Sequence, residues 1–258
     1  AEEYVQVVDK LGEASWADGD GLRDKAGHRF ADASKIHRVN HQGTHFQVDA
    51  IHLCEPSPQR TPVLYQAGAS TRGRQFAADH AECVFINGPS QKVVRDIATD
   101  IRSRAVKSGR DANDTKIFTL MTVITGPTHE AAQAKYNEYL NHVSEDGALA
   151  LMSGWTGVDF SQLPPDEPIQ FSNRNAMVSA LESFTTADPG RSWTPRQIAR
   201  QAAIGGRGSV TVGSYTEVAD TFQEWIDNAG VDGVNLAYAV TPETFKMFII
   251  QLIFLFQN

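Results

Sequence analysis

The sequence repeats one pattern about five times after residue 60: a short apolar run, then an amphipathic segment. Runs of this kind predict strands and the amphipathic segments predict helices. The crossovers between successive runs are long enough for strands that lie parallel in one sheet. The order of elements therefore predicts an α/β fold, either a β/α barrel or a doubly wound sheet.

The length of the chain indicates whether a β/α barrel would be complete or partial. A (β/α)8 TIM barrel needs eight strands and typically about 250 residues. Here 258 residues also include a helix expected over Glu2–Trp16, a β-hairpin expected over His37–Leu53 and a Pro-rich region at 143–195 without clear strands. We therefore predict a partial barrel that forms a single domain over residues 1–258. The region 143–195 is predicted to be an insertion.

The segment from Thr61 to Phe85, TPVLYQAGASTRGRQFAADHAECVF, predicts a strand, a turn, a helix and a second strand. Gly68 ends the first apolar run, and Ser70 stands where a helix N-cap is expected. The unpaired N–H groups and the dipole of a helix N-terminus favour an anion such as a phosphate. Two interpretations follow: a cofactor phosphate site, or an ordinary capped turn, because serine is common at N-caps.

The rest of the chain predicts further alternating elements. Thr115–Thr125 is a continuous apolar run, typical of a parallel strand covered on both faces. Two other strands are expected, over Ser209–Val212 and Val231–Tyr238. Helices are expected over Val93–Val106, Glu130–His142 and Thr194–Ala203. A further helix should run from a capping box at Ser214–Glu217 to Asn228, and a last one should begin at Thr241. The apolar run Phe245–Phe256 is too short to span a bilayer and is predicted to pack into a core.

The predicted hairpin carries His37, His41 and His45, spaced by four residues. On a helix this spacing would line one face and could bind a metal ion. The alternating pattern around Gln42-Gly43 favours strands instead, and the two strands of a hairpin do not easily bring three imidazoles together. We therefore expect solvated hairpin histidines and no metal site.

Composition narrows the classes of partner. A net charge of −8 argues against a nucleic-acid partner held by bulk electrostatics, and no segment predicts a membrane span. Cys54 and Cys83 lack CxxC spacing, which predicts neither a disulfide framework nor zinc and fits a reducing, cytoplasmic setting. The uncapped helical start at Ala1 and the apolar end of the chain suggest an incomplete domain.

The run YQAGASTRGRQFAADHAECVF resembles the signature segment of the bacterial-luciferase-like flavin monooxygenases. The branch it resembles contains nitrilotriacetate monooxygenase and dibenzothiophene-sulfone monooxygenase, with long-chain alkane monooxygenase nearby. Four other stretches resemble the same branch in the same order: AEEYVQVVDKLGEASW, GHRFADASKIHRVNHQGTHFQV, SGWTGVDFS and GVDGVNLAYAVTPETF. The resemblance extends to about Phe248 and corresponds to the C-terminal portion of the family's barrel.

This resemblance implies an FMN-dependent monooxygenase that uses reduced FMN, supplied by a separate flavin reductase, and O₂ to oxygenate a small organic substrate. It also implies homo-oligomers in the full-length family. In the family the AGxS turn holds the FMN phosphate, which assigns that role to Gly68, Ala69 and Ser70. The segment Trp155–Phe160 is expected to close over the substrate.

The resemblance leaves the catalytic residues unknown. Family members carry the flavin-ring contacts, with a His and a Tyr near the ring, ahead of the helix that opens this chain. We therefore expect these 258 residues to be inactive alone. Two alternatives remain: a truncated, non-catalytic chain that binds FMN or a partner, and a different phosphate-binding barrel enzyme.

Overall fold

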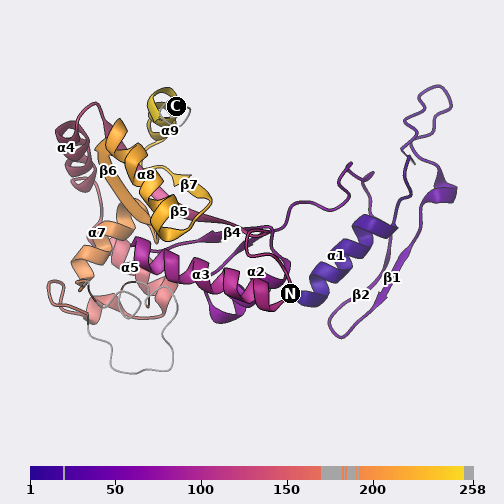
Figure 1. The fold of residues 1–258 in the computed structure, drawn as a ribbon, viewed down its shortest axis with the longest axis horizontal. Coiled ribbons are helices and arrows are strands. Elements are labelled where there is room, and N and C mark those ends of the chain that lie inside the picture. The colour runs from indigo at the N-terminus through magenta and orange to yellow at the C-terminus, as the bar shows by residue number, and fades with distance from the viewer. Residues whose placement is uncertain (20, 170–181, 183, 185–189, 191, 253–258) are drawn as a thin grey trace. The chain divides into compact units, whose positions relative to one another are not determined.

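The computed structural model describes residues 1–19, 21–169, 182, 184, 190 and 192–252. The chain forms two compact units, Ala1–Val63 and Leu64–Asn258, whose elements are labelled in Figure 1. Among the described residues, no helix combines the length and apolar character needed to cross a membrane.

The first unit packs one helix beside one hairpin (Figure 1). Helix α1 (Glu2–Ala14) ends two residues before the predicted end. Strands β1 (Val39–Gln42) and β2 (Gln47–Ala50) pair antiparallel, which confirms the predicted hairpin.

A half-buried carboxylate joins the helix to the hairpin loop. Glu3 of α1 accepts hydrogen bonds from the backbone N–H groups of His45 and Phe46, at 2.9 and 2.8 Å. Its carboxylate also lies 3.2 Å from Nε2 of His41, whose Nδ1 lies 3.2 Å from the ammonium group of Lys10. His41 is only 6% exposed, so the prediction of solvated histidines is wrong at this position. Its ring fills the space between a cation and an anion of α1.

The second unit contains a five-stranded parallel sheet, which confirms the predicted fold class. Its strands are β3 (Tyr65–Ala67), β4 (Cys83–Ile86), β5 (Lys116–Gly126), β6 (Ser209–Ser214) and β7 (Gly233–Ala237). Its helices are α2 (Thr71–His80), α3 (Gln91–Lys107), α4 (His129–Leu140), α5 (Glu145–Thr156), α7 (Pro195–Gly205), α8 (Tyr215–Ala229) and α9 (Glu243–Met247), followed by a π-helical turn over Phe248–Leu252.

Strand β5 organises this sheet, because three other strands bond to it. β4 pairs with its residues 116–119 and β6 with residues 121–126, whereas β7 pairs with residues 118–122 and overlaps both. A strand has two edges, so β4 and β6 follow each other along one edge and β7 takes the other. The strands do not close into a barrel within the described part of the chain.

The two halves of β5 have different surroundings. Ile117, Met121 and Val123 point into a core that contains the apolar faces of α2, α3 and α8. On the opposite face of the amino-terminal half, Phe118 is half-buried and contacts Phe85. In the carboxyl half, residues 121–126 are buried on both faces. The prediction of a strand covered on both faces therefore holds for the carboxyl half only.

The predicted insertion contains a helix that the sequence pattern did not reveal. Helix α5 begins at Glu145, capped by the Ser144 hydroxyl, and ends before Gly157 in a left-handed conformation. Phe160 follows in a short 3-10 turn and is 1% exposed, packed with Met152 and residues of α7 in a second core. Residues 170–181 of the predicted insertion and 253–256 of the predicted last helix lie outside the described residues.

One carboxylate holds β5, α3 and the end of α8 together. Asp232 Oδ2 accepts from the backbone N–H of Ile117 and from Nη2 of Arg102, each at 2.8 Å. Arg102 Nη1 also donates to the carbonyl of Gly230 at 2.6 Å. Asp232 therefore fixes the entry into β7 against the neighbouring strand.

We expect Asp232→Ala to lower the free energy of unfolding by about 1–3 kcal/mol, because it leaves a backbone donor and a guanidinium without their acceptor. Urea unfolding monitored by circular dichroism measures this change. Asp220→Ala, at an exposed position of α8, is the control and should stay within about 0.5 kcal/mol of the parent. Equal losses in both variants would contradict the role of Asp232.

The Glu3 contacts predict a pH-dependent first unit. Burial raises the pKa of Glu3, but hydrogen bonds from Phe46, His45 and His41 outweigh it and hold the pKa below its ordinary value. A carboxylate with a depressed folded pKa stabilises the fold at neutral pH and loses this effect as the pH falls through that pKa. The parent should therefore lose the contact of α1 with the hairpin as the pH falls below the ordinary pKa of glutamate.

Glu3→Gln should be less stable at pH 7 and should lack this acid transition, whereas Glu13→Gln should behave like the parent. The amide proton shifts of His45 and Phe46, followed from pH 7 to pH 3, report the contact. An unchanged acid transition in Glu3→Gln would exclude Glu3 as its source.

Candidate phosphate site

The predicted phosphate loop lies at the carboxyl end of β3 and leads into α2. Gly68 has φ +140°, a backbone conformation that favours glycine. Ser70 has extended backbone and is the N-cap of α2, as predicted. The loop thus turns the chain within three residues from a parallel strand into a helix. Ligands of open α/β sheets bind at such carboxyl ends.

The Ser70 hydroxyl has a proton left to donate. Its oxygen accepts from the backbone N–H of Gly73 at 3.1 Å, which is the N-cap bond. A hydroxyl can accept in this way and still donate its own proton. The N–H groups of Thr71 and Arg72, in the first turn, have no acceptor within the helix. The loop therefore has a hydroxyl proton and backbone donors available at the start of α2.

Arg74 sets the orientation of the loop. Its Nε donates to the carbonyl of Ala69 at 2.6 Å. In a trans peptide the C=O and the following N–H point in opposite directions, so this bond turns the Ser70 N–H away from Arg74. The sequence pattern did not reveal this contact.

Arg74 belongs to a network between α2 and α3. Its Nη1 lies 3.2 Å from Asp100, which also accepts from Nε of Arg104 at 3.0 Å. Burial raises the pKa of Asp100, but the hydrogen bonds and charges of Arg104 and Arg74 outweigh it and hold the pKa below its ordinary value. Asp100 thus stays ionised and neutralises much of the charge of Arg74. The i, i+4 spacing of Asp100 and Arg104 was visible in the sequence, whereas the partnership with Arg74 was not.

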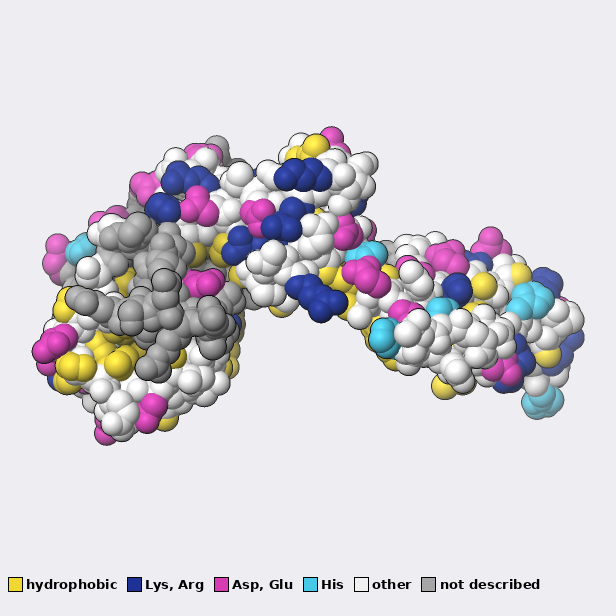
Figure 2. Space-filling view, turned by 90° about the horizontal axis from the view of Figure 1, so that it is seen from below, with side chains coloured by type: hydrophobic (Ala, Val, Ile, Leu, Met, Phe, Trp, Pro, Cys, Tyr) yellow, Lys and Arg dark blue, Asp and Glu magenta, His cyan; other side chains and the backbone are white. Residues whose placement is uncertain are grey.

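Basic side chains lie near the loop. Figure 2 shows Lys and Arg side chains, with Asp and Glu side chains among them, over the part of the second unit that carries α2 and α3. Arg72, in the first turn of α2, is exposed and adds positive charge beside the loop. This charge and the helix dipole both favour an anion at Ser70.

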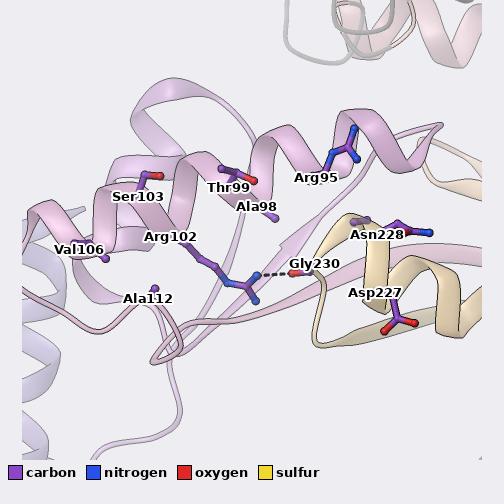
Figure 3. Close-up of a pocket in the computed structure, with 11 residues that line it drawn as sticks. Arg95, Ala98, Thr99, Arg102, Ser103, Val106, Ala112, Asp227, Asn228 and Gly230 are labelled. Atoms are coloured by element: carbon purple, nitrogen blue, oxygen red, sulfur yellow. Dashed lines mark hydrogen bonds between the residues drawn. The ribbon is translucent and has the colours of Figure 1, made fainter.

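A separate groove of about 400 Å³ lies between α3 and the end of α8 (Figure 3). It is lined on α3 by Arg95, Thr99, Arg102 and Ser103, among others, and on the other side by residues 227–230. Arg102 spans it to reach Gly230. The groove therefore belongs to the packing of α3 on α8 and not to the Gly68–Ser70 loop.

Two of the histidines considered as metal ligands take part in contacts with α1 instead. His41 contacts Glu3 and Lys10, and the backbone of His45 binds Glu3. Within the described residues, no three His, Cys, Asp or Glu side chains are grouped so that they could hold a metal ion. Both cysteines are free thiols, Cys54 exposed and Cys83 buried.

The chain is similar to several monooxygenases. It is 51% identical to dimethyl-sulfide monooxygenase of Hyphomicrobium sulfonivorans, over 96% of this chain and 52% of the relative. It is 39% identical to long-chain alkane monooxygenase of Geobacillus thermodenitrificans, again over 96% of this chain and 52% of the relative. The nitrilotriacetate and dibenzothiophene-sulfone monooxygenases are also relatives, at 32% and 31% identity, which confirms the predicted branch.

Solved structures agree with these similarities. The crystal structure of DmoA from H. sulfonivorans matches with a TM-score of 0.85 and 48% identity, over 99% of this chain and 54% of that one. A structure of riboflavin lyase with modified FMN and riboflavin matches with a TM-score of 0.79 and 32% identity, over 99% and 56% of the two chains. The chain thus spans about half the length of the relatives it matches.

The family model for the luciferase-like monooxygenases matches residues 1–233. This match covers most of both units, including the Gly68–Ser70 loop. Together with the parallel sheet and the similarity to solved structures, it confirms the family predicted from the sequence. The chain belongs to the luciferase-like monooxygenase family.

Proposed function

We propose that the chain serves in a flavin-dependent monooxygenase of the two-component type, and that Gly68, Ala69 and Ser70 hold the phosphate of FMN. The observation that carries this proposal is the loop itself. A glycine with positive φ, an oriented peptide and a serine hydroxyl with a free proton stand at a helix N-terminus of a family member. These groups fit a phosphate, which accepts hydrogen bonds and carries negative charge.

Each residue of the loop has a distinct task in this proposal. Gly68 allows the turn that brings the backbone close to the phosphate. The Ser70 hydroxyl donates to a phosphate oxygen, and the Ser70 N–H, turned away from Arg74, donates to another. When bound, reduced FMN supplies the electrons that activate O₂. The loop anchors one end of the cofactor and orients it, while the flavin ring contacts and the catalytic residues are left unassigned.

The relatives indicate the class of substrate. Dimethyl-sulfide monooxygenase and long-chain alkane monooxygenase are named for small or apolar organic molecules. We therefore propose a small organic substrate, O₂ as co-substrate and a separate flavin reductase as the source of reduced FMN. We also propose that the protein forms a homo-oligomer. We further propose a cytoplasmic location, which the two free cysteines support.

The domain assignment extends the proposal to the whole chain. We propose that the two compact units together, residues 1–258, belong to one luciferase-like domain, with residues 143–195 as an insertion in it. Trp155, at the end of α5, is 38% exposed, whereas Phe160 is anchored in the second core. Of the segment Trp155–Phe160, the exposed Trp155 is therefore the side chain that we propose faces the substrate.

Titration with FMN tests the phosphate assignment. We expect Ser70→Ala to weaken FMN binding about tenfold, or about 1.4 kcal/mol, because a charge-assisted hydrogen bond is lost. Flavin fluorescence measures the dissociation constant. Ser144→Ala, which removes the equivalent N-cap hydroxyl of α5, is the matched control and should leave FMN binding unchanged.

Riboflavin lacks the phosphate, so its binding distinguishes the contribution of the phosphate site from that of contacts with the flavin ring. It should bind more weakly than FMN to the parent chain, and Ser70→Ala should not affect its binding. Tight FMN binding that is insensitive to Ser70→Ala would overturn the assignment of the loop.

A further inference from the structure

We propose that the first unit binds a small, uncharged and largely apolar molecule, in a cavity between α1 and the loop over residues 52–62. This site is independent of the proposed phosphate site, because all its residues lie in the other unit. The cavity measures about 710 Å³. Sites for small molecules in proteins typically measure about 300–1,000 Å³.

The walls of the cavity are mainly apolar. Helix α1 contributes Val8 and Leu11 on one side. Three prolines of the facing loop complete the apolar lining: Pro56, Pro58 and Pro62. An apolar ligand would gain free energy in proportion to the apolar area that it and these walls remove from water.

The charged groups at the cavity are already paired within the unit. Glu55 accepts hydrogen bonds from Arg23. The guanidinium of Arg60 donates to the backbone carbonyl of Trp16 and to Asp18. A charged ligand would have to compete with these partners, so the site favours an uncharged molecule.

His52 lines the cavity, and we assign its ring as the hydrogen-bond acceptor for the ligand. Its Nδ1 lies 3.0 Å from the carbonyl oxygen of Cys54. A carbonyl can only accept, so Nδ1 carries the proton, and in the neutral ring Nε2 then has a lone pair. The ligand class is therefore an apolar body with one hydroxyl or N–H donor.

The loop is held in a preformed shape. Arg60 has φ +64°, a conformation that costs free energy in a residue other than glycine. Backbone hydrogen bonds from Arg60 to Ser57 and from Thr61 to Gln59, at 3.0 and 2.8 Å, hold the turn. A cavity with rigid walls loses little conformational entropy when a ligand binds.

Gly12 of α1 lines the cavity, so a larger side chain at this position can be used to fill it. Glycine inside a helix costs about 1 kcal/mol relative to alanine. A Cβ at this position would lie 3.7 Å from both the Arg60 carbonyl oxygen and Cγ2 of Thr61, which is ordinary contact. Gly12→Ala therefore fits, whereas the longer side chain of Gly12→Leu would extend into the space between helix and loop.

The test uses the whole chain labelled with ¹⁵N and titrated with 2-naphthol. We expect saturable shifts of the amides of Leu11, Gly12 and Arg60 in the parent. Gly12→Ala should retain binding, and Gly12→Leu should weaken it at least tenfold. Unchanged amide shifts of His45 and Phe46 check that α1 still packs on the hairpin in each variant.

Two comparisons test the ligand class. 2-Methylnaphthalene, which has no donor, should bind more weakly than 2-naphthol, and His52→Phe should remove that difference. 2-Naphthoate, an anion of similar size, should bind least. Non-saturable shifts in the parent, or binding of 2-naphthol that survives Gly12→Leu in a folded variant, would overturn the proposal.

Discussion

The second unit depends on the backbone hydrogen bonds of β5. This strand is the longest of the sheet and bonds to β4, β6 and β7, so every connection between early and late strands passes through it. Asp232 reinforces the arrangement, since one carboxylate oxygen holds both the Ile117 N–H and Arg102. The proposed phosphate loop depends on β5 indirectly, because β3, which leads into the loop, pairs with β4, and β4 pairs with β5.

Local chemistry in the sequence was sufficient to place most elements. Ser70 was predicted as an N-cap, and the capping box at Ser214 and Glu217 is present with both of its hydrogen bonds. These signals act within one turn of the chain and survive tertiary packing. Helix α5 was missed because its surroundings are rich in Gly and Pro, although Ser144 gives it an N-cap of the same kind.

Features that depend on partners far away in the sequence could not be predicted. The burial of His41 results from Glu3 and Lys10 in α1, more than 30 residues earlier. The orientation of Ala69 results from Arg74, whose guanidinium is in turn held by Asp100 on the next helix. The sequence therefore placed the loop of the candidate site, whereas the network that fixes its geometry required the structure.

The chemistry of the loop limits what it can contribute to cofactor affinity. A helix N-terminus contributes about 0.3–1 kcal/mol to binding an anion at an exposed site, and a hydrogen bond to a charged group about 1.5–3 kcal/mol. With one serine hydroxyl the two contributions together amount to about 2–4 kcal/mol, and only the upper limit reaches the roughly 4 kcal/mol that a dissociation constant of 1 mM requires. Because Gly68 and Ser70 are exposed, salt also weakens the attraction. The loop therefore serves to fix the position and direction of the cofactor, and tight binding requires contacts with the rest of the flavin.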